Sequence, residues 1–430
     1  MEFPATQVRR ERGGVRRRVL LAVAALALVL LAVGLVQWHR IRAARARAAG
    51  PLLIWGVAWL HEPDTIALSV ATRADHDQAL EFPMVVDFAR GVATRVRTPD
   101  GSADGLFLCR PGREFVFPVR PRPGAFAMWR LRHFPMGGLR YRPATGHYPA
   151  GGLPYFDTDL ALWTEGRGCR LLGLPGNNRA PSGSPVGEEV AFLHMSLRRR
   201  SGMGDGIWVV APATGRRRQI SHPGPEDLDG LPRWSPDGRS LAFTRLRRGA
   251  RAPDGRARDL WVAAADGSSE RPLTTAGSLY ARPFEPVDWA RDGASVVCVR
   301  ESRTRDPSVP VDMQTRQSVW RAPLSGAEPT QLLSYEQLHG GPYGAWIAVA
   351  PGGDRVAVIT ETEDGGESCL WIVSTATGEA IRVPAGGDLW PMAWSADGRK
   401  LAFVRDSREA WVTESRDWRH PRRVWRAAGR

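Results

Sequence analysis

The amino-acid sequence predicts an all-β fold, a β-propeller of four-stranded blades, preceded by one transmembrane helix. Two observations predict the propeller. A strand–turn–strand motif occurs five times, with shared glycines 51, 55, 60 and 45 residues apart, and a tryptophan-bearing strand follows each copy. A third observation predicts the helix, because eighteen apolar residues run without a break from Val19 to Val36.

The composition excludes a disordered chain and weakens a nucleic-acid-binding function. Hydrophobic residues make up 43% and charged residues 24% of the 430 positions, as in chains that bury a core. The net charge is +14, but residues 1–50 hold ten arginines against two glutamates, a net +8. Most of the excess charge therefore flanks the apolar segment, and we expect no nucleic-acid partner.

The apolar segment 19–36 is long enough to span a bilayer. As a helix rising ~1.5 Å per residue it would reach roughly 27 Å, near the hydrocarbon thickness. Six arginines precede it and four follow. This bias predicts a cytoplasmic tail (1–18), a membrane helix (19–38), a linker (39–51) and a periplasmic or otherwise extracytoplasmic body. A cleaved signal peptide is the alternative, although its apolar region is ordinarily only about 7–15 residues long.

The body is expected to hold seven blades. Residues 52–183 carry β signals, such as Ile66–Val70 and Met84–Phe88, without the repeat, and their length suits two blades. Residues 184–425 contain five repeat units, each with an Asp-Gly or similar hairpin turn and four expected strands. The five motif copies are Ser184–Phe192, Trp234–Phe243, Trp289–Cys298, Val349–Val358 and Trp394–Phe403. Six or eight blades are the alternatives.

Two of these copies carry a family resemblance. Trp234–Phe243 reads WSPDGRSLAF and Trp394–Phe403 reads WSADGRKLAF. Both resemble the WSPDG repeat of the TolB-type propeller family, which implies the propeller fold for 184–425. The resemblance implies little about activity, since propellers support many unrelated functions.

Acidic residues give the first candidate site. Asp227 and Asp229 lie in a loop leading into an expected inner strand, where they could bind a cation or form part of a solvated loop. The aspartates of the Asp-Gly turns cap their own turns and need no metal. The sequence has no Cys-x-x-Cys and no closely spaced histidine pair, so we predict neither a metal nor a cofactor.

Basic and aromatic residues give a second candidate surface. Arg247, Arg248, Arg251 and Arg256 fall in an expected loop between the second and third strands of one blade. They could hold an anionic partner, such as an envelope protein or a cell-wall polymer, or simply be solvated. The regularly spaced tryptophans are expected to pack between blades, whereas Trp346 and Trp390 stand outside the repeat. We include Trp390 among the binding candidates.

Four cysteines in an exported chain permit disulfides. Cys298 and Cys369 lie in expected strands and are predicted to behave as small buried apolar residues. Cys109 with Cys169 is the pair that could form a bond, and the alternative is two free thiols.

No catalytic constellation is recognisable in the sequence. The chain lacks a G-x-S-x-G nucleophile motif, a P-loop and a dinucleotide fingerprint. We therefore predict a membrane-anchored propeller that binds a protein or ligand without catalysis. The alternative is a metal-dependent propeller enzyme, lactonase- or hydrolase-like, using the axial funnel, with Asp227 and Asp229 as the first suspects. A third possibility is a degenerate relative of a propeller peptidase.

Overall fold

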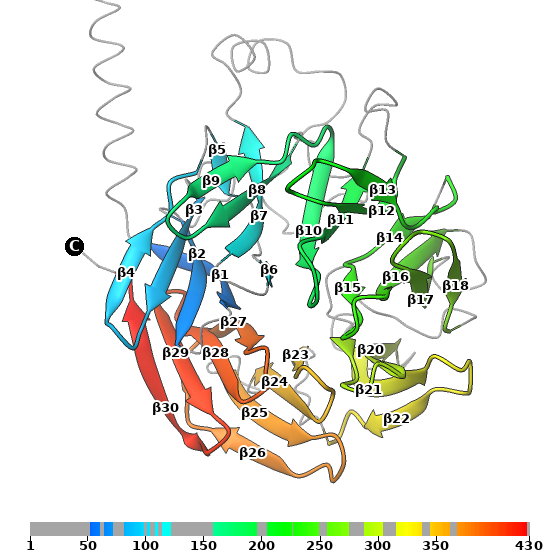
Figure 1. Cartoon of the computed structure of the whole chain (residues 1–430). Helices are drawn as coiled ribbons and strands as arrows, with labels where there is room; N and C mark the ends of the chain where they lie inside the picture. The colour runs from blue at the N-terminus through cyan, green and yellow to red at the C-terminus, as the bar shows by residue number, and fades with distance from the viewer. Residues whose placement is uncertain are drawn as a thin grey trace, which may run out of the picture.

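Seven antiparallel sheets stand around one axis in the computed structural model, which confirms the predicted count of seven blades (Figure 1). Sheet order follows chain order in every blade, so each blade is one consecutive stretch of chain. The structure describes residues 52–60, 64–71, 81–98, 101–103, 108–110, 114–121, 158–195, 204–225, 227–248, 256–274, 288–303, 315–337, 345–361 and 368–427.

The strands are numbered along the chain, four to a blade, and blades 2 and 4 have an inner strand in two pieces. Blade 1 contains β1 (Leu53–Trp59), β2 (Thr65–Ala71), β3 (Glu81–Asp87) and β4 (Val92–Arg95). Blade 2 contains β5 (Gly101–Ala103), β6 (Leu108–Arg110), β7 (Glu114–Pro121), β8 (Asp159–Thr164) and β9 (Gly168–Leu171). Blade 3 contains β10 (Asn177–Gly183), β11 (Val190–Met195), β12 (Gly206–Val210) and β13 (Arg217–Gln219). Blade 4 contains β14 (Leu228–Asp229), β15 (Arg233–Trp234), β16 (Ser240–Arg248), β17 (Arg256–Ala264) and β18 (Glu270–Pro272).

The last three blades follow the same plan. Blade 5 contains β19 (Asp288–Trp289), β20 (Ser295–Arg303), β21 (Thr315–Pro323) and β22 (Thr330–Leu333). Blade 6 contains β23 (Ala345–Val349), β24 (Arg355–Glu361), β25 (Ser368–Ser374) and β26 (Ala380–Val383). Blade 7 contains β27 (Leu389–Trp394), β28 (Lys400–Arg405), β29 (Glu409–Glu414) and β30 (Asp417–Arg426).

The predicted membrane helix at 19–36 lies outside the described residues. Among the residues that the structure does describe, no helix is long and apolar enough to cross a membrane.

The Asp-Gly turns join the first and second strands of a blade. Asp237 accepts hydrogen bonds from the hydroxyl of Ser235 (2.6 Å) and the backbone N–H of Arg239 (3.0 Å), which fixes the turn. Gly238 follows with φ of 68°, and a Cβ there would lie 2.3 Å from Cγ2 of Val186 in the neighbouring blade. Only glycine therefore fits both the left-handed backbone and the close approach of blade 3.

Tryptophans on the inner strands join neighbouring blades by one recurring hydrogen bond. In each case the indole N–H donates to a backbone carbonyl on the inner strand of the preceding blade. The pairs are Trp234 with Ser182, Trp289 with Arg233, Trp394 with Ala348 and Trp59 with Ala393, all at 2.9–3.0 Å. The rings lie in the apolar layers between blades, as expected for this set.

The pair Trp59–Ala393 closes the ring, because it joins blade 1 to blade 7. Ile54, Leu68 and other side chains of blade 1 form one core cluster with Val404 and Val412 of blade 7. Lys400, the only lysine in the chain, bridges the same joint through Asp64 at 2.8 Å. Closure thus depends on side-chain packing rather than on a strand shared between the two ends of the ring.

The tryptophans on the third strands are used differently. Their rings are half-buried, and an arginine of the second strand covers three of them. The distances from guanidinium carbon to ring centroid are 4.2 Å for Arg245 on Trp261, 5.0 Å for Arg300 on Trp320 and 4.4 Å for Arg405 on Trp411. Trp261 pairs with Phe243, so Arg245, two residues further on, projects from the same side of the sheet. The expectation that all repeated tryptophans pack between blades therefore holds for the inner-strand set, whereas the third-strand tryptophans are half-buried and three of them lie under arginines.

Candidate functional site

The candidate residues gather at one face of the propeller. In each blade the inner strand runs toward the turn that joins it to the second strand, an Asp-Gly turn in blades 4, 5 and 7, so its first residues lie at the opposite face. That face also carries the connections between second and third strands. Asp227, Asp229, Trp346 and Trp390 all lie at or near the start of an inner strand. In Figure 1 the labels of β10, β15, β23 and β27 mark the middle of the ring.

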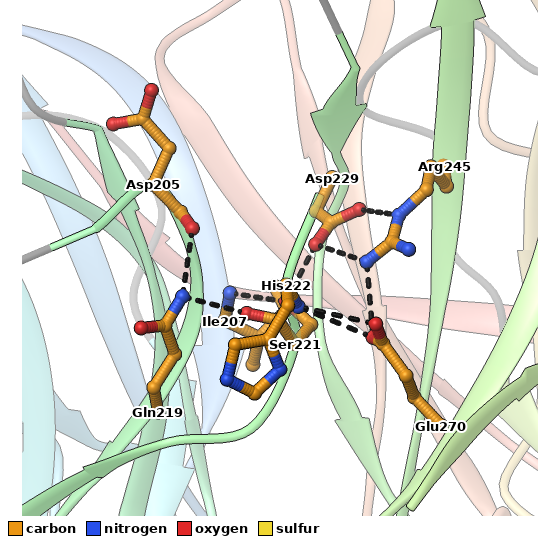
Figure 2. Close-up of polar contacts among 8 residues, drawn as sticks. All are labelled: Asp205, Ile207, Gln219, Ser221, His222, Asp229, Arg245 and Glu270. Carbon is orange, nitrogen blue, oxygen red and sulfur yellow. Dashed lines mark hydrogen bonds and ion pairs between the residues drawn. The ribbon is translucent and has the colours of Figure 1, made fainter. Parts of the chain in front are cut away.

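Asp229 is buried in a charged network between blades 3 and 4 (Figure 2). Its Oδ1 lies 2.6 Å from Nε of Arg245, and its Oδ2 lies 3.0 Å from Nη2 of the same guanidinium. Ser221 of the blade 3–4 connection donates its hydroxyl to Oδ2 at 2.5 Å. Nη2 of Arg245 also reaches Oε2 of Glu270 at 3.1 Å, and Glu270 accepts the backbone N–H of His222. The Asp229 and Arg245 side chains are 0% and 4% exposed.

The electrostatics of this network describe a structural ion pair. Burial raises the pKa of the Asp229 carboxyl, against the opposing influence of Arg245 and Ser221. Burial alone would lower the pKa of Arg245, but its hydrogen bonds to Asp229 and Glu270 raise it, so the guanidinium stays charged. Both Asp229 oxygens are occupied by protein donors. Asp229 is therefore neither part of a solvated loop nor a ligand that faces an open site.

Asp227 and Asp229 do not combine into a metal centre. Asp227 lies in a short turn, where its backbone N–H donates to the carbonyl of Gly224 at 3.0 Å. Across the part of the chain that the structure describes, no group of three or more His, Cys, Asp or Glu side chains could hold a metal ion.

The basic surface differs from its sequence prediction, because most of the expected loop is strand. Arg247 and Arg248 belong to β16 and Arg256 to β17, with Arg248 opposite Arg256 in the ladder. Arg247 forms an ion pair with the buried carboxylate of Asp259 on the facing strand. Arg251 lies outside the described residues. Replacing all four arginines would therefore disturb the blade, contrary to the expectation that they lie in a loop.

Trp390 meets Trp346 across the joint between blades 6 and 7. Their ring centroids are 5.8 Å apart and the rings are inclined at 55°. Trp346 is 44% exposed, the one tryptophan among the described residues with a largely exposed side chain. The register of β27 shifts between Leu389 and Met392, where Pro391 cannot donate a ladder hydrogen bond. This irregularity allows Trp390 to depart from the regular alternation of the strand.

The disulfide considered between Cys109 and Cys169 is not formed, because Cys169 is a free thiol. Cys109 pairs with Phe115, Phe115 with Trp163, and Trp163 with Cys169. Three strand spacings, about 14 Å, therefore separate the two cysteines, far beyond the reach of a disulfide. Burial raises the pKa of the Cys169 and Cys298 thiols to about 12, which keeps both protonated.

A cavity of about 450 Å³ lies between the outer parts of blades 6 and 7. Cys369, Arg382 and Arg419 contribute to its lining, and Nη2 of Arg382 lies 3.4 Å from the Cys369 sulfur. Cys369 is half-buried rather than buried, which differs from its prediction as a small core residue.

The sequence reasoning missed Arg245 as the residue that organises the blade 3–4 joint. A signal was present, because an arginine stands two residues after the last position of three motif copies. These are Arg245, Arg300 and Arg405, the same three arginines that cover third-strand tryptophans.

Comparison with known proteins finds similarity to peptidases, both in sequence and in fold. No protein-family model matches the chain. The uncharacterized peptidase YuxL of Bacillus subtilis is 26% identical over 214 residues, which cover 43% of this chain and 30% of that protein. The matched stretch is thus less than a third of the length of this relative.

Solved structures show the same fold in peptidases. The propeller domain of the Trilobed protease from Pyrococcus furiosus, described as having an open velcro topology, gives a TM-score of 0.56 at 9% identity and covers 88% of this chain and 100% of that one. A puromycin-hydrolyzing peptidase of Mycobacterium tuberculosis gives 0.55 at 16%, over 89% of this chain and 54% of that one. TolB from Acinetobacter baumannii gives 0.43 at 14%, over 88% and 81%. At these identities the Pyrococcus and Mycobacterium structures support the propeller fold.

The sequence match to a peptidase overturns the prediction of a binding module without catalysis. The relation favours the enzyme reading that the sequence analysis kept as its alternative. The prediction failed because it relied on local catalytic motifs, and none of the motifs sought occurs in the sequence.

Proposed function

We propose that this chain works in peptide hydrolysis, as the propeller of a peptidase-type enzyme. The observation that carries the proposal is the 26% identity to a peptidase over 214 residues. That stretch is long enough to exceed a single repeat unit, so it relates several blades rather than one motif. The propeller would act on the peptide by admitting and orienting it at the face where the inner strands begin.

The arrangement of the described residues supports this role. Structural contacts account for Asp229 and Arg245, whereas Trp346 presents exposed indole surface at that face beside the half-buried Trp390. A rigid scaffold that presents a few exposed side chains near its axis is the usual design of a ligand site in a propeller or barrel.

The test is hydrolysis of a peptide mixture by the full-length chain, purified in detergent micelles. Product masses identify the bonds cleaved, and an identical preparation from cells with an empty vector is the control. A host strain that lacks the gene should lose the same activity and regain it with the gene restored. If neither the purified chain nor the gene affects cleavage of any peptide, the proposal is wrong.

The TolB-type repeat relation and the membrane anchor are further parts of this proposal. The apolar segment 19–36 would hold the propeller at the extracytoplasmic side of a membrane, where acidic envelope proteins or cell-wall polymers could meet the β16–β17 hairpin. Protease added to intact spheroplasts should digest the propeller. Digestion only after lysis would contradict this orientation.

A further inference from the structure

Trp346, which is exposed, and Trp390, which is half-buried, form an aromatic pair near the starts of the inner strands of neighbouring blades. Trp346 is the second residue of β23 and Trp390 the second residue of β27. Of the other inner-strand tryptophans, Trp59, Trp234 and Trp289 are buried between blades at 5%, 7% and 2% exposure, and Trp55 and Trp394 are half-buried. Trp346 instead keeps 44% of its surface exposed while touching Trp390. Exposed aromatic surface of this size on a rigid strand indicates a binding function.

Two carboxylates, those of Asp388 and Asp406, flank the Leu389–Arg405 strand pair that precedes Trp390 in blade 7. Asp388 precedes Trp390 by two residues, about 7 Å along an extended strand. Its backbone N–H donates to Oδ1 of Asp406 at 3.1 Å, and the N–H of Asp406 donates to the Asp388 carbonyl at 2.7 Å. Asp388 and Asp406 are both exposed. The nearest cation to Asp406 is Arg405 at 3.7 Å, whose charge is shared with Glu409 at 2.7 Å.

Indole faces together with carboxylates suit an organic cation. The face of a tryptophan ring attracts a guanidinium or ammonium group, and a neighbouring carboxylate adds charge attraction. The protein itself shows this preference, because Arg245 and Arg405 lie 4.2 and 4.4 Å from the rings of Trp261 and Trp411.

We infer that Trp346 and Trp390, with Asp388 and Asp406, form a subsite for a positively charged group of a peptide. The inference rests on the proposed function and adds a substrate preference to it. A guanidinium or ammonium side chain, or the free N-terminus, would lie on the indole surface with its charge toward the two aspartates.

Isothermal titration of the full-length chain in detergent micelles tests the inference. The probe is acetyl-Gly-Arg-Gly-Arg-Gly-amide, and the matched ligand replaces both arginines by citrulline, which has the same shape without the charge. We expect the arginine peptide to bind at least about fivefold more tightly. A third peptide with a free N-terminus and no basic side chain identifies the source of the cation, because fivefold tighter binding than its acetylated form assigns the N-terminus.

Variants locate the effect. Trp346→Ala with Trp390→Ala should abolish the preference for arginine, and Asp388→Asn with Asp406→Asn should reduce it. Val186→Ala, which shortens an exposed side chain at the opposite face, should leave it unchanged. Trp346→Phe with Trp390→Phe keeps the rings and should give an intermediate preference even if the alanine variant fails to fold.

Equal affinity for the arginine and citrulline peptides, with no preference for a free N-terminus, would overturn the inference. So would a preference that survives in a folded alanine variant. Because titration measures binding without cleavage, a chain that prefers the cation but cleaves nothing contradicts the proposed function alone. A chain that cleaves peptides without this preference contradicts the subsite alone.

Discussion

At the scale of single residues, the buried side chain of His194 makes the stability of the fold depend on pH. It is 0% exposed on β11, and its Nδ1 lies 2.9 Å from Oδ1 of Asn178. An amide oxygen only accepts, so Nδ1 donates in this pair. Trp208 meets the ring edge-on at 6.4 Å, at the position where arginines cover tryptophans in other blades. Burial lowers the pKa of His194 below its ordinary value of 6.5, so the folded protein keeps it neutral.

Stability should therefore fall in mild acid. Below pH 6.5 this histidine is mostly protonated in the unfolded chain, but it stays neutral in the folded chain until a lower pH. The free energy of unfolding therefore decreases as pH falls. Between pH 7.5 and 5.5 the loss from this group is at most about 1.4 kcal/mol, the limit for a histidine that stays neutral throughout in the folded protein. Urea unfolding at both pH values checks it, and His194→Gln should show a smaller loss. His420→Gln, at an exposed position of β30, is the control. Equal pH dependence in wild type and His194→Gln would contradict the assignment.

At the scale of elements, the ion pair between β14 and β16 holds a joint between blades. Arg245 links Asp229 to Glu270 across blade 4, and Ser221 ties the pair to the connection from blade 3. Removing one partner of a buried pair leaves an uncompensated charge, which typically costs more than the pair itself contributes.

Arg245→Met should consequently destabilise the protein by about 3 kcal/mol or more. Arg245→Met combined with Asp229→Leu should recover part of this loss, because it removes both charges. Arg300→Met is the matched control, since Arg300 occupies the same position in blade 5 and is only half-buried. Chemical denaturation of wild type, Arg245→Met, Asp229→Leu and the double variant gives the coupling energy. A cost for Arg245→Met no larger than for Arg300→Met would show that the ion pair is unimportant.

The two scales differ in how much the sequence predicts. The Asp-Gly turns and inner tryptophans are local and repeated, so the five blades of 184–425 follow from the pattern, whereas the two blades of 52–183 are predicted only from β signals and length. The partners of Asp229 are Ser221 and Arg245, and Arg245 in turn binds Glu270, so only folding brings this network together. The contact of Trp346 with Trp390 likewise depends on a joint between two blades. The β16–β17 hairpin was underestimated because charged residues such as Arg247 and Asp259 resemble loop residues until their cross-strand pairing is known.

At the scale of the whole molecule, the joint between blades 1 and 7 should open before the others. It has the same tryptophan-to-carbonyl hydrogen bond as the internal joints but no continuous chain across it. Trp59→Ala should cost about 3–5 kcal/mol and reduce hydrogen-exchange protection chiefly in β1, β2, β27 and β28. Trp289→Ala removes the equivalent bond between blades 4 and 5 and should affect only those blades. Uniform loss of protection over the ring in both variants would contradict this picture.

The same joint has a consequence for how the gene could be rearranged. Blade 7 contacts blade 1 through the same indole-to-carbonyl hydrogen bond that Trp234, Trp289 and Trp394 form at joints inside the ring. By this contact the closing joint does not differ from those internal joints. A circular permutation that linked residue 427 to residue 52 and opened the chain between two other blades would retain every sheet intact. Repeated tandem duplication of one blade-sized segment would then be enough to produce the ring. The chain ends could fall between any two blades.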